Sequence, residues 1–173
     1  MKLETTRLIL RTPVPEDAER YVKIHNSLFV LRFNAMQPTT VEWMHNNLQN
    51  TEYLETAVFL EEKESRTLIG AIFMEEDGLR YGVNSKDLSY FIDESYSRKG
   101  YMKEAMQALI NHLFREEKLE CICCRAFAPN TASRMLLKSL GFRENGIIPH
   151  CVKGYTGEIF DDVIHTLFLP DLK

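Results

Sequence analysis

The stretch Tyr90-Phe91-Ile92-Asp93-Glu94-Ser95-Tyr96-Ser97-Arg98-Lys99-Gly100-Tyr101-Met102-Lys103-Glu104-Ala105 predicts a strand, a polar turn and the start of a helix in immediate succession. The first amides of a helix lack intrahelical partners and lie at the positive end of the helix dipole, so they bind phosphate oxygens well. Gly100 lets a ligand approach the backbone, and three side chains add positive charge: Arg98, Lys99 and Lys103. The stretch predicts an anion site, although a solvated basic turn before a helix is the more common alternative.

The segment after this turn carries the clearest helical pattern in the chain. Apolar residues recur at i, i+4, i+7, i+8, i+11 and i+12, namely Met102, Met106, Leu109, Ile110, Leu113 and Phe114. One amphipathic helix that packs against a core is therefore expected here.

Working outward, short apolar segments alternate with helical ones. We expect strands near residues 6–12, 57–60, 68–74, 88–92, 122–128 and 162–169, with a further short strand between 146 and 153. Helices are expected to open near 16–17, at 39–42 and at 131–140; Thr39 and Glu42 have the spacing of a capping box. The order predicts an α+β (mixed α/β) fold, a mixed sheet with helices on both faces, in one domain over residues 1–173.

Composition excludes several classes of function. The net charge of −4, without a basic patch interleaved with aromatic residues, argues against a nucleic-acid partner. No Gly-Lys-Ser/Thr and no Gly-x-Gly-x-x-Gly motif is present, which argues against ATP hydrolysis and dinucleotide binding. The four cysteines lack a zinc-type spacing and are expected to be reduced thiols, so no metal is expected: Cys121, Cys123, Cys124 and Cys151. Without a long apolar run or a secretory signal, we expect a cytoplasmic protein with no membrane partner.

Four segments, in the right order, resemble a known family. They are Glu4 to Arg11, Arg98 to Ala105, Asn130 to Ser133 with Leu140-Gly141-Phe142, and Asp161 to Ile164. The chain resembles the GNAT superfamily of N-acetyltransferases, in particular the branch that acetylates the N-termini of ribosomal proteins. The resemblance covers nearly the whole chain. It implies a three-layer fold with a central, mostly antiparallel sheet, acetyl-CoA as cosubstrate, and direct transfer of the acetyl group to a primary amine in a ternary complex.

The resemblance also implies roles for particular residues. The strand at 90–92 would pair with the pantetheine arm, and a backbone amide at Phe91 or Ile92 would hold the thioester oxygen. The pyrophosphate would contact the turn at Arg98, Lys99, Gly100, Tyr101 and Met102. Asn130 would bind pantetheine, and Ser133 would act as the catalytic acid, because Leu137 stands where many members carry a tyrosine. Helix capping is the alternative role for Asn130 and Ser133.

The acceptor side is left open by the sequence. Asp87, Glu144, Glu158 and His150 are candidates for the general base, and each is also an ordinary surface group. His25, Asn26 and Trp43 are candidates for the acceptor pocket, with a core position as the alternative for Trp43. A protein N-terminus and a small-molecule amine both fit, as do a monomer and a homodimer. Because Ser95, Arg98 and Leu137 depart from the family pattern, a non-catalytic module that binds acyl-CoA is the second hypothesis, and a purely structural or partner-binding domain is the third.

Overall fold

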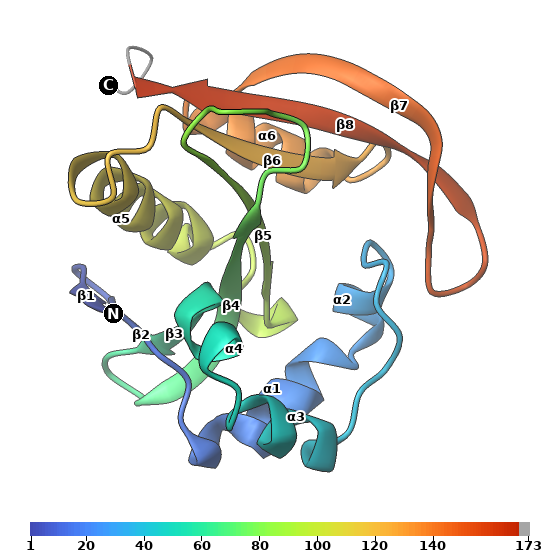
Figure 1. The fold of residues 1–173 in the computed structure, drawn as a ribbon. Coiled ribbons are helices and arrows are strands. Elements are labelled where there is room, and N and C mark those ends of the chain that lie inside the picture. The colour runs from blue at the N-terminus through green and yellow to red at the C-terminus, as the bar shows by residue number, and fades with distance from the viewer. Residues whose placement is uncertain (170–173) are drawn as a thin grey trace.

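The computed structural model describes residues 1–169 and contains one eight-stranded sheet (Figure 1). The strand order is β1-β2-β3-β4-β5-β6-β8-β7, and every neighbouring pair is antiparallel except β5 and β6. The strands are β1 Lys2–Glu4, β2 Leu8–Arg11, β3 Ala57–Glu62, β4 Thr67–Glu76, β5 Ser85–Ile92, β6 Cys121–Phe127, β7 Arg143–Lys153 and β8 Ile159–Phe168. The predicted mixed, mostly antiparallel sheet is confirmed.

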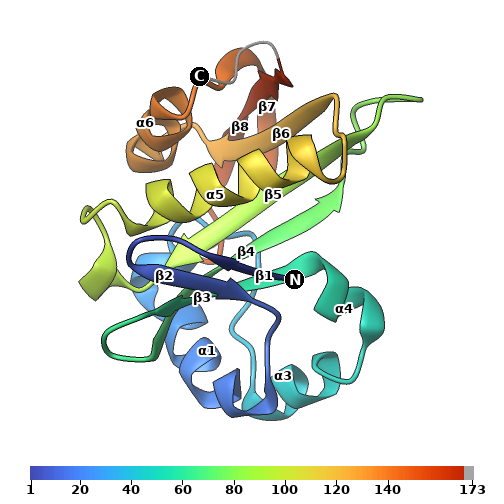
Figure 2. The same ribbon diagram turned by 90° about the vertical axis from the view of Figure 1, so that its left-hand side faces the viewer.

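Helices cover both faces of the sheet. One side carries the helices of the N-terminal half: α1 Ala18–His25, α2 Leu28–Leu31, α3 Val41–Asn47 and α4 Thr51–Thr56. Figure 2 shows α5, Tyr101–Arg115, on the opposite side of β2 and β3 from α1 and α3. The remaining helix is α6, Thr131–Ser139, and two 3-10 turns lie at Pro15–Asp17 and Glu94–Tyr96. No helix within residues 1–169 has the length and apolar character needed to cross a membrane.

Strand β3 shows why the sheet has two cores. Val58 and Leu60 pack into the core under α5, whereas Ala57 and Phe59 pack into a second core beneath α1 and α3. Successive side chains of a strand point to opposite faces, so a strand covered on both faces is apolar at nearly every position. The run of apolar residues in β3 follows from its position in the middle layer.

The helical stripe predicted from Met102 onward is confirmed. Its members line the side of α5 that faces the sheet, and all six are at most 7% exposed: Met102, Met106, Leu109, Ile110, Leu113 and Phe114. Strand β6 supplies the other wall of that core, and its Cys121, Cys123 and Cys124 are buried free thiols, as expected. Burial raises the pKa of Cys123 to about 12, so the thiol stays protonated.

Several local predictions were wrong. The helix cap is Thr40, whose side chain accepts a hydrogen bond from the Trp43 amide at 3.1 Å, so the proposed capping box at Thr39 and Glu42 is displaced by one residue. The short elements β1, α2 and α4 were not expected. Strand β7 is eleven residues long and not short, and its pairing with β8 is interrupted by two register shifts.

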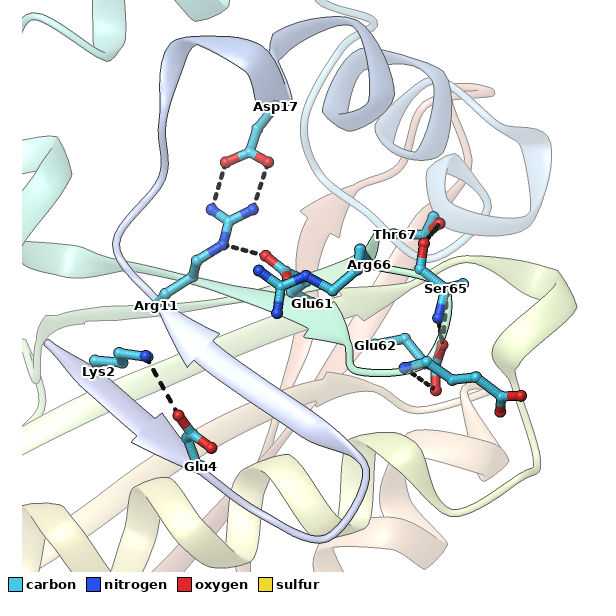
Figure 3. Close-up of polar contacts among 10 residues, drawn as sticks. Lys2, Glu4, Arg11, Asp17, Glu61, Glu62, Ser65, Arg66 and Thr67 are labelled. Atoms are coloured by element: carbon cyan, nitrogen blue, oxygen red, sulfur yellow. Dashed lines mark hydrogen bonds and ion pairs between the residues drawn. The ribbon is translucent and has the colours of Figure 1, made fainter.

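An ion-pair network joins β2 and β3 to the segment that precedes α1 (Figure 3). The Arg11 guanidinium donates to both oxygens of Asp17, at 2.7 and 2.8 Å, and to Glu61 Oε2 at 2.7 Å. Arg66 forms an ion pair with the other Glu61 oxygen at 2.8 Å. Because Asp17 precedes α1 and Glu61 lies on β3, these pairs tie β2 to the elements on both sides of it.

The parallel pair β5–β6 is joined over only part of its length. Pairing runs only from Ser85 opposite Cys121 to Leu88 opposite Cys124. Strand β5 nevertheless continues to Ile92, and β6 continues to Phe127. The two strands therefore lose contact over their last residues, and the sheet has an opening in its middle.

Candidate active site

The free edge of β5 in this opening presents backbone groups in a defined alternation. The Asp93 amide donates to Ile69 O of β4 at 2.7 Å, and the register then pairs Ile92 with Gly70 and Phe91 with Ala71. In an antiparallel pair, hydrogen-bonded and non-hydrogen-bonded positions alternate, so the Phe91 backbone faces β4, whereas the Ile92 backbone faces the opening. Of the two predicted amides, the geometry favours Ile92 for a ligand.

The turn between β5 and α5 has the backbone shape of an anion site. Arg98 and Gly100 have φ values of 56° and 80°. The first hydrogen bond of the helix runs from the Glu104 amide to Gly100 O at 3.0 Å. The amides from Gly100 to Lys103 therefore precede the helical ladder, and no side chain caps the Gly100 position. Left-handed residues that alternate with ordinary ones form concave nests of amides that bind anions.

The residues predicted at this turn lie together, with their side chains in different environments. Arg98, Lys99 and Lys103 are exposed, as an electrostatic role requires. Met102 is 7% exposed and packs into the core, so only its amide can face a ligand. Arg98 adopts the left-handed conformation typical of glycine, which explains how the turn keeps its shape without glycine there.

Two arginines, both missed in the sequence, hold the turn at its two ends. Arg20 of α1 forms an ion pair with Asp93 at 2.5 Å. Arg7 donates to Lys99 O at 2.9 Å and to Glu104 Oε2 at 2.7 Å, and its guanidinium carbon lies 4.1 Å from the centre of the Tyr101 ring. Arg7 belongs to the first segment that resembles the family, but only the fold shows that it contacts the turn.

Glu104 is the carboxylate that fixes Arg7. Burial acts to raise the pKa of Glu104, but hydrogen bonds from Thr5 and from the Arg7 amide and side chain outweigh it and hold the pKa below its usual value. Beside this cluster, a hollow of about 470 Å³ opens along the flank of α5, lined by residues that include Thr5, Gly100, Lys103 and Gln107. Gly100 and Lys103, which belong to the turn and the first turn of α5, border this hollow.

Asn130 and Ser133 lie at the start of α6, across the opening from β5. Asn130 caps the helix by accepting from the Ser133 amide at 3.2 Å. The Ser133 hydroxyl is 2.7 Å from the Tyr90 hydroxyl, so a hydrogen bond joins α6 to β5. Burial raises the pKa of Tyr90 well above its usual value, so Tyr90 stays protonated and its hydroxyl can donate a hydrogen bond to Ser133. Tyr90 was missed as a site residue, because its partner lies 43 positions away in the sequence.

The predicted acceptor-pocket residues lie in three different settings. His25 is fully buried, and its ring packs edge-on against Phe91 with centroids 5.8 Å apart. The Asn26 amide group pairs with both backbone groups of Thr39, at 2.8 and 2.9 Å, and so holds the segment before α3. Trp43 is 37% exposed and packs against Tyr53, which in turn contacts Phe73 beside Phe91.

The candidate bases also differ in environment. Asp87 accepts from Arg125 Nε at 3.0 Å, and burial raises its pKa against the opposing effect of Arg125. Glu144 is exposed and paired with Arg134 at 2.8 Å. Glu158 and His150 are exposed, and Glu158 lies near the tip of the β7–β8 hairpin. Only Asp87 belongs to the middle of the sheet.

These features define an acyltransferase-like arrangement, in which an open strand edge leads to an amide nest. Residues 7–143 match the family model described as "Acetyltransferase (GNAT) domain". Because this match spans most of the chain, the protein belongs to the GNAT acetyltransferases and is an N-acetyltransferase.

Individual relatives agree with this assignment. The uncharacterized N-acetyltransferase YoaA of Bacillus subtilis is 23% identical over 189 aligned positions, with 97% of each chain covered. The solved ribosomal-protein-S5-alanine acetyltransferase from Vibrio fischeri has a TM-score of 0.87 at 18% identity and covers 100% of this chain and 99% of its own. Mycobacterium smegmatis RimJ, solved with CoA-disulfide, has a TM-score of 0.80 at 18% identity and covers 95% and 83%. At such identities, the structural matches show the shared fold.

Proposed function

We propose that this protein transfers the acetyl group of acetyl-CoA to a primary amine by direct attack within a ternary complex. One observation carries the proposal: the free backbone of β5 at Ile92 and the amide nest at Gly100 lie at two ends of one short segment. An extended pantetheine arm can pair with the first, and a diphosphate can bind the second.

The chain's own groups then have defined tasks. The Ile92 amide donates to the thioester oxygen, which polarises the carbonyl and stabilises negative charge on that oxygen. The amides from Gly100 to Lys103 hold the diphosphate, with Arg98, Lys99 and Lys103 as countercharges. Asn130 orients the arm while it caps α6.

The proton on sulfur comes from Ser133. In the overall reaction, the amine nitrogen forms a bond to the acetyl carbon, the carbon–sulfur bond breaks, and one proton leaves nitrogen while another reaches sulfur. The Ser133 hydroxyl donates to the developing thiolate, and Tyr90 positions that hydroxyl by donating to its oxygen. The proton that leaves nitrogen restores the hydroxyl through solvent.

The acceptor is a primary amine, either a small molecule or a protein N-terminus. A hollow of about 330 Å³ lies between α2 and the tip of the β7–β8 hairpin, and it is lined by Leu28, Arg32, Tyr155, Thr156 and Glu158. We assign the approach of the acceptor to this side. Figure 1 shows the hairpin curving toward α2.

Calorimetric titration with acetyl-CoA, with acetyl-pantetheine as the matched control, tests the cofactor part of the proposal. Acetyl-pantetheine lacks the diphosphate, so it should bind at least about tenfold more weakly, as the loss of one charge-assisted hydrogen bond predicts. Thiol release with n-butylamine, 2-phenylethylamine and a short peptide then tests transfer. Tight acetyl-CoA binding with no thiol release from any amine would favour the non-catalytic module instead.

A further inference from the structure

One buried carboxylate on the acceptor side has no role in the steps above. Asp162 lies on β8 opposite Phe127, the last residue of β6. It is 3% exposed, and within residues 1–169 its Oδ1 atom has no hydrogen-bond partner. Burying a carboxylate oxygen without a partner is costly, so this oxygen can accept a hydrogen bond from a ligand or from water.

Three phenylalanines from separate segments gather beside Asp162. The rings of Phe127 and Phe160 stack at 5.2 Å, and Phe33, from the segment after α2, packs edge-on against both, at 6.5 and 6.3 Å. Phe160 and Asp162 are two positions apart on β8 and share one face of the sheet. Aromatic faces next to a carboxylate are the surroundings that bind an organic cation.

This cluster borders the opening in the sheet. Phe127 lies beyond Cys124, the last residue of β6 that pairs with β5. Asp87, by contrast, pairs with Cys123 in the closed part of the sheet. Asp162, which pairs with Phe127, therefore lies at the end of the sheet where β5 and β6 no longer pair, whereas Asp87 lies where they do.

Charge in this region also favours a cation. Arg125 lies between two carboxylates, with Nε 3.0 Å from Asp87 and Nη1 3.8 Å from Asp162. One guanidinium thus faces two carboxylates, which leaves one negative charge in excess when both are ionised. The closer pair is the one with Asp87, so Asp162 is the less neutralised of the two.

We propose, on the basis of the function proposed above, that Asp162 and the Phe33–Phe127–Phe160 cluster bind the ammonium group of the acceptor, and that Asp162 removes its proton. In that step, an ammonium proton passes to a carboxylate oxygen, which leaves a neutral amine and a carboxylic acid. The acid later returns the proton to water. The neutral amine then has the lone pair that attack on the thioester requires.

The pH dependence of this subsite follows from its neighbours. The charges that act on Asp162 are those of Arg125 on β6 and His165 on β8. Other charged groups contact its neighbours: Asp87 pairs with Arg125, Glu144 with His165, Arg32 lies over the Phe33 ring, and Asp161 accepts from the His150 amide. Burial raises the pKa of Asp162, against the opposing effects of Arg125 and His165. Cation binding should therefore be present above this raised pKa and disappear as the pH falls through it, at a higher pH than for an ordinary aspartate.

The test compares 2-phenylethylamine with 2-phenylethanol, a neutral probe of the same size, for binding to the complex with CoA by saturation-transfer NMR. In the unchanged protein, the amine should bind at least about tenfold more tightly near pH 7, the gain expected of a charge-assisted hydrogen bond, and only the amine should lose affinity at low pH. Equal binding of the two probes would overturn the proposal without touching the acetyl-CoA site, whose affinity is measured separately.

Two isosteric variants locate the effect. Asp162→Asn should bring the ratio of the two dissociation constants, 2-phenylethanol over 2-phenylethylamine, close to one, while acetyl-CoA affinity stays as before. Asp87→Asn also removes a buried carboxylate partner of Arg125, but it should keep the preference. If Asp87→Asn abolishes the preference and Asp162→Asn retains it, the assignment of Asp162 is wrong. The comparison of probes in the unchanged protein remains decisive if a variant fails to fold.

Discussion

Replacement of Gly100 by alanine tests the amide nest directly. Gly100 has φ of 80°, and a methyl group built there would lie 3.4 Å from Arg7 Nη2, at the flexible end of that side chain. The steric contact is therefore small, and the main cost is the left-handed backbone, about 1 kcal/mol for a residue with a Cβ atom. In a chain of this size, that corresponds to a fall in Tm of about 2–4 °C.

The loss of affinity should exceed this loss of stability. To relieve the strain, the backbone must leave φ of 80°, which turns the amides at the start of α5 away from the diphosphate. The loss of one charge-assisted hydrogen bond, about 1.5 kcal/mol, raises the Kd for acetyl-CoA about tenfold. Alanine is a cleaner probe than a β-branched residue, which would be a severe outlier at this φ and would destabilise the fold as well.

Gly82 provides the matched control. It has φ of 69°, and a methyl group there would meet nothing within 4 Å. Gly82→Ala should therefore lower Tm by a similar amount and leave the Kd for acetyl-CoA unchanged. Thermal unfolding and calorimetric titration of both variants give the answer. If Gly100→Ala binds acetyl-CoA as tightly as the unchanged protein, the diphosphate does not bind at this turn.

Four further variants extend the test. Ser133→Ala should lower kcat about 100-fold, the usual contribution of a general acid. Tyr90→Phe should lower kcat about fivefold, because one hydrogen bond is lost. If acetyl-CoA affinity falls by the same factor as kcat, both residues have structural roles only. Arg98→Gly relieves left-handed strain but removes a cation, so Tm should not fall, and the Kd for acetyl-CoA should depend less on salt; a lower Tm would contradict the strain. The pKa of Glu104 is lower in the folded than in the unfolded protein, so its pairing stabilises the fold above the unfolded-state pKa. This stabilisation is lost as the pH falls through the folded-state pKa. Denaturant titrations of Glu104→Gln should therefore show a flatter loss of stability below about pH 4.3.

Local patterns predicted the elements that are long and periodic. The stripe on α5 repeats over four turns, and β3 is apolar because both of its faces are covered. Helix α2 spans only four residues, too few to show a period, and it was missed. The cap at Thr40 was misplaced because Thr39 and Thr40 carry the same hydroxyl, and backbone geometry decides between them.

The site residues also fall into two groups: some are contiguous in sequence, and others are brought together only by the fold. The strand, the turn at Gly100 and the helix could be predicted because they are contiguous in sequence, and the anion site at this turn stays a prediction. Arg7 and Tyr90 contact partners that only the fold brings near: Glu104 is 97 positions from Arg7, and Ser133 is 43 positions from Tyr90. No local pattern distinguishes Asp162 from Asp161 beside it; the alternation of strand β8 does, because it buries one of the two carboxylates on the acceptor face.

The bond from Arg7 to Lys99 O changes how sequence variation in this protein should be interpreted. The segment before β2 and the turn before α5 are separated by most of the first hundred residues, yet this hydrogen bond holds them together. In a mutational scan scored by acetyl-CoA affinity, Thr5, Arg7 and Glu104 should therefore group with Gly100, although none of the three belongs to the turn itself. In related proteins, substitutions in the turn should therefore be accompanied by substitutions at these three positions rather than by substitutions in the core.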